Sequence, residues 1–189
     1  MAKPPRSWLR SNIDKLLVPA LEQRGFARVR LSAADARSEM AFLTPHGSFR
    51  RPGPQGLETI EIHFARYGAA VFRLDFGILP PGGVSYSHAS GSGHIAQEDM
   101  CTGAVEVSYV LLPWPRLWIE FRVCRWPGRT VVESDYEKLV GKVVGLIPEI
   151  ERVFKDGKCG PHVRVSDKRF RPNRLQRFLL RISGDRSGP

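Results

Sequence analysis

Residues 59–79 read TIEIHFARYGAAVFRLDFGIL, and they decide the fold. Apolar and polar residues alternate twice along this stretch, on either side of a short Gly-Ala-Ala segment. Successive side chains of a β-strand point to opposite faces, so a period of two predicts two strands, each with one apolar and one polar face. The apolar set is Ile60, Ile62, Phe64, Phe72, Leu74, Phe76 and Ile78. We therefore expect both strands to lie in a sheet whose apolar face is covered.

The two strands are close enough in sequence to form an antiparallel hairpin. Directly opposed residues share a face, so a loop with an odd number of residues is needed to bring both apolar sets together. A loop of residues 68–70 meets this condition and places His63 opposite Asp75. A turn at residues 67–69 would instead place Glu61 opposite Asp75, two like charges, and we predict the first register for that reason.

The polar face of this hairpin carries a candidate site. It consists of Glu61, His63, Arg73 and Asp75. A histidine beside an aspartate and near an arginine is suited to acid/base chemistry or to anion binding. Half-solvated antiparallel sheets, however, need alternating polar residues whatever their function, so we interpret the four as cross-strand pairs that face water. Trp118 and Trp126 make the polar face of a later strand unusually aromatic and complete the candidate surface.

The N-terminal segment has helical periodicity. Apolar residues recur every three or four positions from Trp8 to Leu21, and Gly25 ends the pattern. Pro19 removes one backbone donor and crowds the preceding turn. This predicts a kink, or two short helices joined near Val18.

A second helix is predicted towards the C-terminus. Ser134 and Glu137 fit a capping box, and an apolar stripe follows until Gly157 ends it. Pro148 predicts a kink within this helix.

Shorter segments complete the pattern. We predict strands at residues 26–31, 39–44, 105–111 and 117–123, and a loop at residues 50–56. The order helix, strands, helix indicates an α+β domain in which an antiparallel β-sheet has the N- and C-terminal helices packed on one face.

Composition bears on domain number and compartment. A chain of 189 residues with 42% apolar composition is long enough for one domain, which we assign to residues 1–161, followed by a basic C-terminal extension at residues 162–189. The apolar runs are too short for a membrane span or a signal peptide. Three cysteines without paired spacing indicate a reducing compartment, and we predict a cytoplasmic protein.

The net charge of +10 belongs to the two ends of the chain. Residues 1–30 contribute +5, residues 31–161 contribute −1 and residues 162–189 contribute +6. The extension has the pattern of a basic amphipathic helix, with Arg171, Arg174, Arg177 and Arg181 largely opposite an apolar stripe. Such a helix is suited to phosphate backbones or an anionic membrane, and its apolar stripe is equally suited to docking on the domain or on a partner.

Sequence signatures of common catalytic sites are missing. The chain has no GxSxG, Walker loop, HExxH, GxGxxG or paired CxxC motif. The Gly/Ser-rich segment 80–103 holds His88, His94, Asp99 and Cys101, but their spacing matches no metal-ligand motif. We interpret this segment as a mobile connection between strands, and we predict no metal and no cofactor.

A family resemblance rests on three stretches, PALEQRGF, IEIHFARYG and VFRLDFGILPPGG, followed by the capped C-terminal helix. With these features the chain resembles the bacterial family known as domain of unknown function 4304 over about residues 9–156. The resemblance implies a small cytoplasmic α+β protein and no established catalytic residues. The segment 80–103 and the basic extension depart from the family's pattern.

Three functions are compatible with these patterns. The leading hypothesis is a non-enzymatic binding or interaction module with a protein partner, because catalytic motifs are missing and one sheet face is rich in aromatic residues. The alternative is association with nucleic acid through the basic N- and C-terminal segments. A hydrolytic or metal-dependent enzyme that uses His63, Asp75 and the segment 80–103 is the weaker alternative.

Overall fold

The computed structural model describes residues 6–31, 37, 39–88, 91–105, 107–113, 119–123 and 130–167. Its helices are α1 (Arg6–Asn12), α2 (Val18–Glu22), α3 (Glu39–Leu43) and α4 (Glu133–Asp156). Its strands are β1 (Ala27–Val29), β2 (Ser48–Gly53), β3 (Gly56–Phe64), β4 (Val71–Leu79), β5 (Val84–His88), β6 (Gly91–Ile95), β7 (Val107–Leu111), β8 (Phe121–Arg122) and β9 (Val163–Asp167). A π-helical turn, η1 (Ile13–Leu17), and the 3₁₀ turns η3 (Arg66–Gly68), η4 (Gln97–Asp99) and η5 (Thr102–Ala104) complete the described elements.

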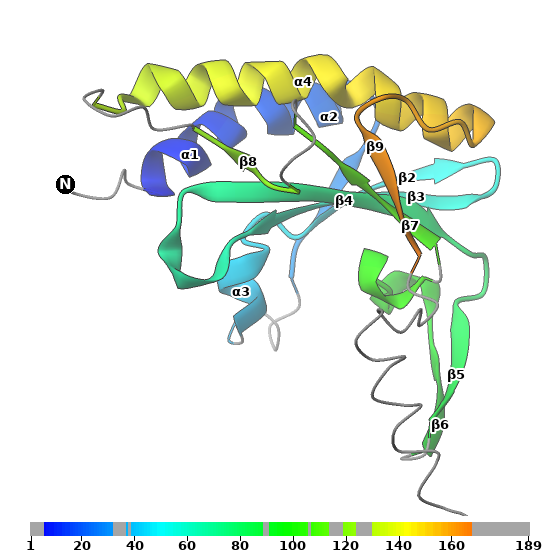
Figure 1. The fold of residues 1–189 in the computed structure, drawn as a ribbon. Coiled ribbons are helices and arrows are strands. Elements are labelled where there is room, and N and C mark those ends of the chain that lie inside the picture. The colour runs from blue at the N-terminus through cyan, green and yellow to red at the C-terminus, as the bar shows by residue number, and fades with distance from the viewer. Residues whose placement is uncertain are drawn as a thin grey trace, which may run out of the picture.

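One seven-stranded sheet organises the domain. Its order is β1-β2-β3-β4-β7-β9, with β8 paired to the start of β4. All of these neighbours run antiparallel. Helices α1, α2 and α4 lie together over one face of the sheet (Figure 1). This arrangement confirms the predicted α+β fold with both terminal helices on one face.

The main core fills the space between these helices and the sheet. The alternating residues that define the predicted strands supply its floor, and Ile60, Ile62, Phe72, Leu74 and Phe76 are fully buried there. Aromatic rings join the two layers, since the Phe76 ring lies edge-on to that of Phe154 in α4 at 5.7 Å. Burial of each such side chain contributes roughly 1.5–3 kcal/mol, so this one-sided core is the main source of stability.

The N-terminal helix changes its winding ahead of Pro19. Between α1 and α2 the chain makes the π-helical turn Ile13–Leu17, and Pro19 occupies the first turn of α2. Proline has no N–H to offer the preceding turn, and a wider turn accommodates that loss. The interruption predicted near Val18 is therefore present, as a π turn within one helical run.

Helix α4 starts earlier than predicted. Its N-cap is Val132, whose N–H donates to Asp135 Oδ2 at 3.1 Å, while Asp135 N–H donates to the Val132 carbonyl at 3.1 Å. The capping box assigned to Ser134 and Glu137 is therefore wrong, because the carboxylate one residue after Ser134 closes the cap. The helix continues through Pro148 to Asp156, and Gly157, with φ 67°, caps its C-terminal end as predicted. The kink expected at Pro148 stays a prediction. Most of the predicted apolar stripe is buried: Tyr136, Val140, Val143, Ile147, Ile150, Val153 and Phe154. Two further members of the predicted stripe, Leu139 and Val144, are partly buried against the core.

The strand predicted at residues 39–44 is wrong, because residues 39–43 form helix α3. The segment is too short for alternation to separate a strand from a helical turn. Phe42 is 45% exposed in the helix. The Arg6 guanidinium lies 3.8 Å from the centre of the Phe42 ring and donates to the Phe42 carbonyl, so a cation satisfies the C-terminal end of α3.

The loop predicted at residues 50–56 is also wrong, because β2 and β3 form a hairpin there with Gly53 opposite Gly56. Pro52 is tolerated in β2 because β1 pairs only with Ser48 to Arg50. Gly56 has φ 145°, and a Cβ there would lie 2.4 Å from the Leu79 carbonyl oxygen. Glycine at this position thus allows β3 to start close against the end of β4.

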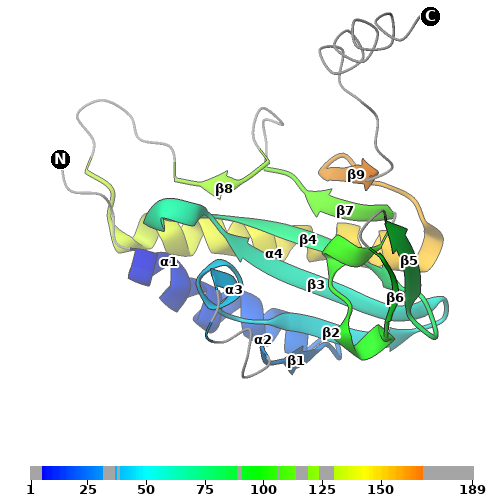
Figure 2. The same ribbon diagram turned by 90° about the horizontal axis from the view of Figure 1, so that it is seen from below.

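The segment 80–103 is more structured than predicted. It contains the β5–β6 hairpin and the turns η4 and η5, all on the sheet face opposite α4 (Figure 2). Leu79, Met100 and Val105 form a second small core on this face, with Leu57, Val84 and Ile95 packed around it. The interpretation as a mobile connection missed this core because its residues are scattered along the sequence.

Strand β9 extends the sheet beyond β7, with Val163 opposite Leu111 and Asp167 opposite Val107. Residues 163–167 of the predicted extension are therefore a sheet strand, and the rest of the extension lies outside the described residues. Strands β7 and β8 fall within the strands predicted at residues 105–111 and 117–123. Among the helices that the structure describes, none is long and apolar enough to cross a membrane.

Candidate functional site

The hairpin of β3 and β4 has the register that we rejected. Glu61 lies opposite Asp75 and His63 lies opposite Arg73. Ala65 N–H donates to the Val71 carbonyl at 3.2 Å, so the turn is centred on Gly68. The turn keeps the odd parity that aligns both apolar faces, but the placement of His63 opposite Asp75 is wrong.

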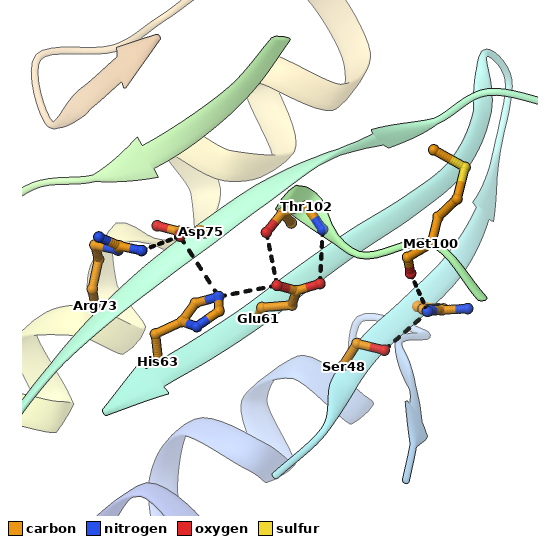
Figure 3. A network of polar contacts seen from close by, with 8 residues as sticks. Ser48, Glu61, His63, Arg73, Asp75, Met100 and Thr102 are labelled. Atoms are coloured by element: carbon orange, nitrogen blue, oxygen red, sulfur yellow. Dashed lines mark hydrogen bonds and ion pairs between the residues drawn. The ribbon is translucent and has the colours of Figure 1, made fainter. Parts of the chain in front are cut away.

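His63 and Arg73 explain why the two carboxylates tolerate this register. His63 Nε2 lies 3.0 Å from Glu61 Oε2 and 3.6 Å from Asp75 Oδ2, so the imidazole bridges both carboxylates (Figure 3). Arg73 Nη2 donates to Asp75 Oδ2 at 2.7 Å. The imidazole between the two carboxylates and the Arg73 guanidinium beside Asp75 therefore offset the cross-strand repulsion that a pairwise argument predicts.

Thr102, from a distant part of the chain, also contacts this group of side chains. Its backbone N–H donates to Glu61 Oε1 at 2.8 Å and its hydroxyl donates to Glu61 Oε2 at 2.7 Å (Figure 3). Burial favours the neutral acid, but hydrogen bonds from His63 and Thr102 outweigh it and hold the pKa of Glu61 below its ordinary value. We call Glu61, His63, Arg73, Asp75 and Thr102 the polar network.

Arg50 binds the segment around η4 and η5, to which Thr102 belongs. Arg50 donates to the carbonyls of Glu98 and Met100, both at 2.6 Å, and to Ser48 Oγ at 3.0 Å. The segment around η4 and η5 is thus attached to the sheet at two points, through Arg50 and through Glu61. As a result Glu61 is only 5% exposed, and the expectation that all four polar-face residues face water is wrong.

The polar network is better suited to holding this segment than to catalysis. Most of its hydrogen bonds join its own members, although Asp75 Oδ1 and Arg73 Nε are buried without a hydrogen-bond partner among the described residues. Within the described part of the chain, no group of three or more His, Cys, Asp or Glu side chains is arranged to hold a metal ion. The other predicted site residues lie outside the described residues: Trp118, Trp126, Arg171, Arg174, Arg177 and Arg181.

A second candidate site is a concave pocket of about 350 Å³ at the β1 edge of the sheet. Three of its lining residues are arginines and none is acidic. The lining consists of Arg10, Arg28, Arg30, Leu31, Ala41, Pro45, His46 and Gly47. We call this cavity the arginine pocket.

Local structure brings the three arginines together. Arg10 comes from α1, Arg28 lies in β1, and Arg30 directly follows the end of that strand; all three line the same pocket. Arg28 is fixed by the pocket wall, because its Nε donates to the His46 carbonyl at 2.8 Å and its Nη2 to the Pro45 carbonyl at 3.4 Å.

Gly47 permits the close approach of β1 to this wall. Its φ is 70°, and its N–H donates to the Thr44 carbonyl at 2.9 Å to close the turn after α3. A Cβ at Gly47 would lie 2.1 Å from the Val29 carbonyl oxygen and 3.3 Å from the Arg30 Cα. A side chain here would push away the strand end that carries Arg30.

His46 is buried in the same turn. It is 1% exposed, its ring stacks on Phe64 at 5.8 Å, and neither ring nitrogen has a hydrogen-bond partner among the described residues. Burial is the main reason that the pKa of His46 falls to about 4; Asp14, 3.3 Å from Nδ1, opposes the shift, and Arg28 and Arg10 add to it. His46 is therefore neutral at pH 7.

Arg10 and Arg30, both exposed, differ from the arginines that form ion pairs in the described part of the chain. Arg51 Nη2, for example, lies 2.6 Å from Glu58 Oε2, and Arg73 is paired with Asp75. In the described part of the chain, no carboxylate lies within ion-pair distance of Arg10 or Arg30. The sequence signal for this site was the +5 charge of residues 1–30; His46 had no pattern that identified it.

Comparisons with family models, with curated proteins and with solved structures found no match for this chain. The resemblance to domain of unknown function 4304 therefore stays a prediction, and the function is argued from the two sites alone.

The first prediction concerns the polar network. Glu61→Gln keeps the side-chain shape but removes the charge that Thr102 and His63 stabilise, so we expect the free energy of unfolding at pH 7 to fall by about 1–3 kcal/mol, measured by urea denaturation. Glu120→Gln is the matched control, since Glu120 pairs with Arg122 at 2.8 Å on a half-exposed surface, where we expect a change below about 1 kcal/mol. Equal losses in the two variants would contradict a special role for Glu61.

The pH dependence of this variant tests the same charge. The pKa of Glu61 is lowered in the folded chain, so its stabilising contribution is complete above the unfolded pKa and is lost as the pH falls through the folded pKa. Denaturation curves of Glu61→Gln should therefore change less than those of the natural chain through the acidic range. An unchanged acid dependence would show that Glu61 is not held as a carboxylate.

A separate pH prediction concerns His46. The unfolded chain takes up a proton at this histidine near pH 6.5, whereas the folded chain does so only near pH 4, so stability falls as the pH drops through this window. The loss is on the order of 3 kcal/mol. His46→Leu should remove this loss, while His94→Gln, at an exposed histidine, should keep it. Identical pH profiles of thermal unfolding for the natural chain and His46→Leu would refute the assignment.

Proposed function

We propose that the protein is a non-enzymatic binding module that takes an anionic ligand in the arginine pocket. The observation that carries the proposal is the pair Arg10 and Arg30, which line a concave cavity without a carboxylate partner among the described residues. Clustered guanidinium groups repel one another, and a bound anion relieves that repulsion.

The location of the pocket supports a binding role. It lies where α1, the β1 edge and the turn after α3 meet. Its arginines come from α1, from β1 and from the residue after β1, and the turn supplies Pro45, His46 and Gly47. Arg28 is already oriented by two carbonyl groups, which reduces the conformational entropy that a ligand must remove. A volume of about 350 Å³ is at the small end of the range for small-molecule sites.

The enzymatic alternative has less support. His63 and Asp75 belong to the polar network, where they help to hold the segment that covers Glu61. A cytoplasmic location remains part of the proposal and is supported by Cys101 and Cys159, which are exposed and unpaired thiols.

Anion titration of the full chain tests the proposed function. We expect sulfate, phosphate or acetate at low ionic strength to shift the side-chain NMR signals of Arg10 and Arg30. The double variant R10Q/R30Q should weaken the affinity at least about tenfold, because it removes two charge-assisted donors. R152Q/K155Q removes the same charge from exposed positions on α4 and should leave the affinity unchanged. Equal weakening in both double variants would contradict a defined pocket.

Nucleic-acid association is a second candidate function, favoured by the gathering of Arg10, Arg28 and Arg30 on one surface of the basic N-terminal segment. Gel-shift titrations of duplex DNA over a salt series test it. Under this function R10Q/R30Q should reduce the slope of log affinity against log salt by about 2. A chain ending at Asp167 keeps β9 and isolates the contribution of the remaining extension. Salt-independent binding would exclude this function.

A further inference from the structure

The charge around the arginine pocket favours a dianion. The lining residues carry three guanidinium groups, and Asp14, which faces His46 at 3.3 Å, is the nearest carboxylate in ion-pair contact with a lining residue, so these groups sum to +2. A carboxylate ligand would leave one positive charge uncompensated. A phosphoryl group with two negative charges would neutralise the set, and attraction between charges grows with the charge of each partner.

The available donors favour an oxyanion with several acceptors. Each guanidinium has five N–H donors in a planar fork. Arg28 uses Nε and Nη2 on the carbonyls of its own pocket wall. Arg10 and Arg30 have no such partner in the described part of the chain, so their forks are available to a ligand. A tetrahedral phosphoryl group offers three terminal oxygens and can accept from two forks at once.

The remaining wall is apolar. Leu31, Ala41 and Pro45 line the cavity beside the arginines. A bare inorganic ion makes no use of such surface, whereas the organic part of an ester would bury apolar area against it. The cavity volume of about 350 Å³ limits that organic part to a small group.

We propose that the arginine pocket binds small phosphomonoesters, with the phosphoryl group held by Arg10 and Arg30 and the organic group against Leu31, Ala41 and Pro45. This inference rests on the proposed function, because it names the class of anion that the pocket takes. The proposal distinguishes small phosphomonoesters from a nucleic-acid backbone, because the phosphodiesters of that backbone carry one negative charge each and have no terminal phosphoryl group.

His46 provides a local readout of occupancy. The groups that act on its charge are Asp14, which favours the imidazolium, and Arg28 and Arg10, which disfavour it. A phosphomonoester has its second pKa at about 6 and so carries roughly one negative charge where His46 titrates. Beside Arg10 and Arg28 this anion offsets their effect, so a bound phosphoryl group should raise the pKa of His46. Ligands that bind elsewhere on the basic surface should leave this pKa unchanged.

The experiment titrates the full chain with phenyl phosphate, benzoate, inorganic phosphate and a ten-residue oligothymidylate at constant ionic strength. Affinity is measured by calorimetry, and the His46 imidazole is followed by NMR. We expect phenyl phosphate to bind about tenfold more tightly than benzoate or inorganic phosphate, since it alone combines the dianion with an apolar group. R10Q/R30Q should abolish this preference and the shift of the His46 signal, and R152Q/K155Q should retain both.

Each contrary outcome has a distinct meaning. Equal affinity for benzoate would overturn the phosphoryl assignment while the proposed anion site stands. Equal affinities for phenyl phosphate and inorganic phosphate would show that the organic group makes no contribution, and would overturn the assignment to an ester. Tighter binding of the oligonucleotide, increasing with its length, would assign the surface to nucleic acid. Failure of all four probes to bind would reject the proposed function together with this inference.

Discussion

The carboxylate of Glu61 is the constraint on which the arrangement of the second sheet face depends. A buried charge in the middle of a sheet must be compensated by nearby cations and hydrogen-bond donors. His63 supplies a bridge to Asp75, and Thr102 supplies two donors from forty-one residues further along the chain. One side chain thereby couples the register of β3 and β4 to the position of the segment around η5. The helices cover one face of the sheet, and the Glu61 carboxylate holds the segment around η5 on the other face.

The one-sided core explains where a ligand site is available. Helices α1, α2 and α4 cover the apolar face (Figure 1), while the β5–β6 hairpin lies on the opposite side of the sheet (Figure 2), where the second core also packs. The short edge strand β1 has all of its residues exposed. Arg28 and Arg30 therefore project from an edge that neither layer covers, beside Arg10 of α1. Gly47 allows the turn after α3 to lie against this edge. The pocket therefore forms where α1, the end of β1 and this turn meet.

The sequence predicted what alternation and helical periodicity can predict. The two long strands, the apolar stripe of α4, its end at Gly157 and the α+β architecture were all correct because each follows from local spacing. The register of β3 and β4 was not, since the facing carboxylates are compensated by His63 and Arg73 and by Thr102, which no local pattern connects to Glu61. The second core and His46 were missed for the same reason. The segments that bury these residues, and the donors that compensate the charge of Glu61, are distant from them in sequence.

The arginines differ in how many of their donors the fold itself uses. Arg51 donates to Glu58 at 2.6 and 2.8 Å and to the Arg24 carbonyl at 2.6 Å, and its guanidinium lies 4.3 Å from the centre of the Phe26 ring. The guanidinium of Arg51 is thus engaged by contacts within the fold. Arg10 and Arg30 carry the same group, yet they line a cavity with their donors unused by the described residues. Both side chains are exposed, so their donors can reach a ligand without displacing a contact of the fold, and this is why the proposed anion site uses them rather than Arg51.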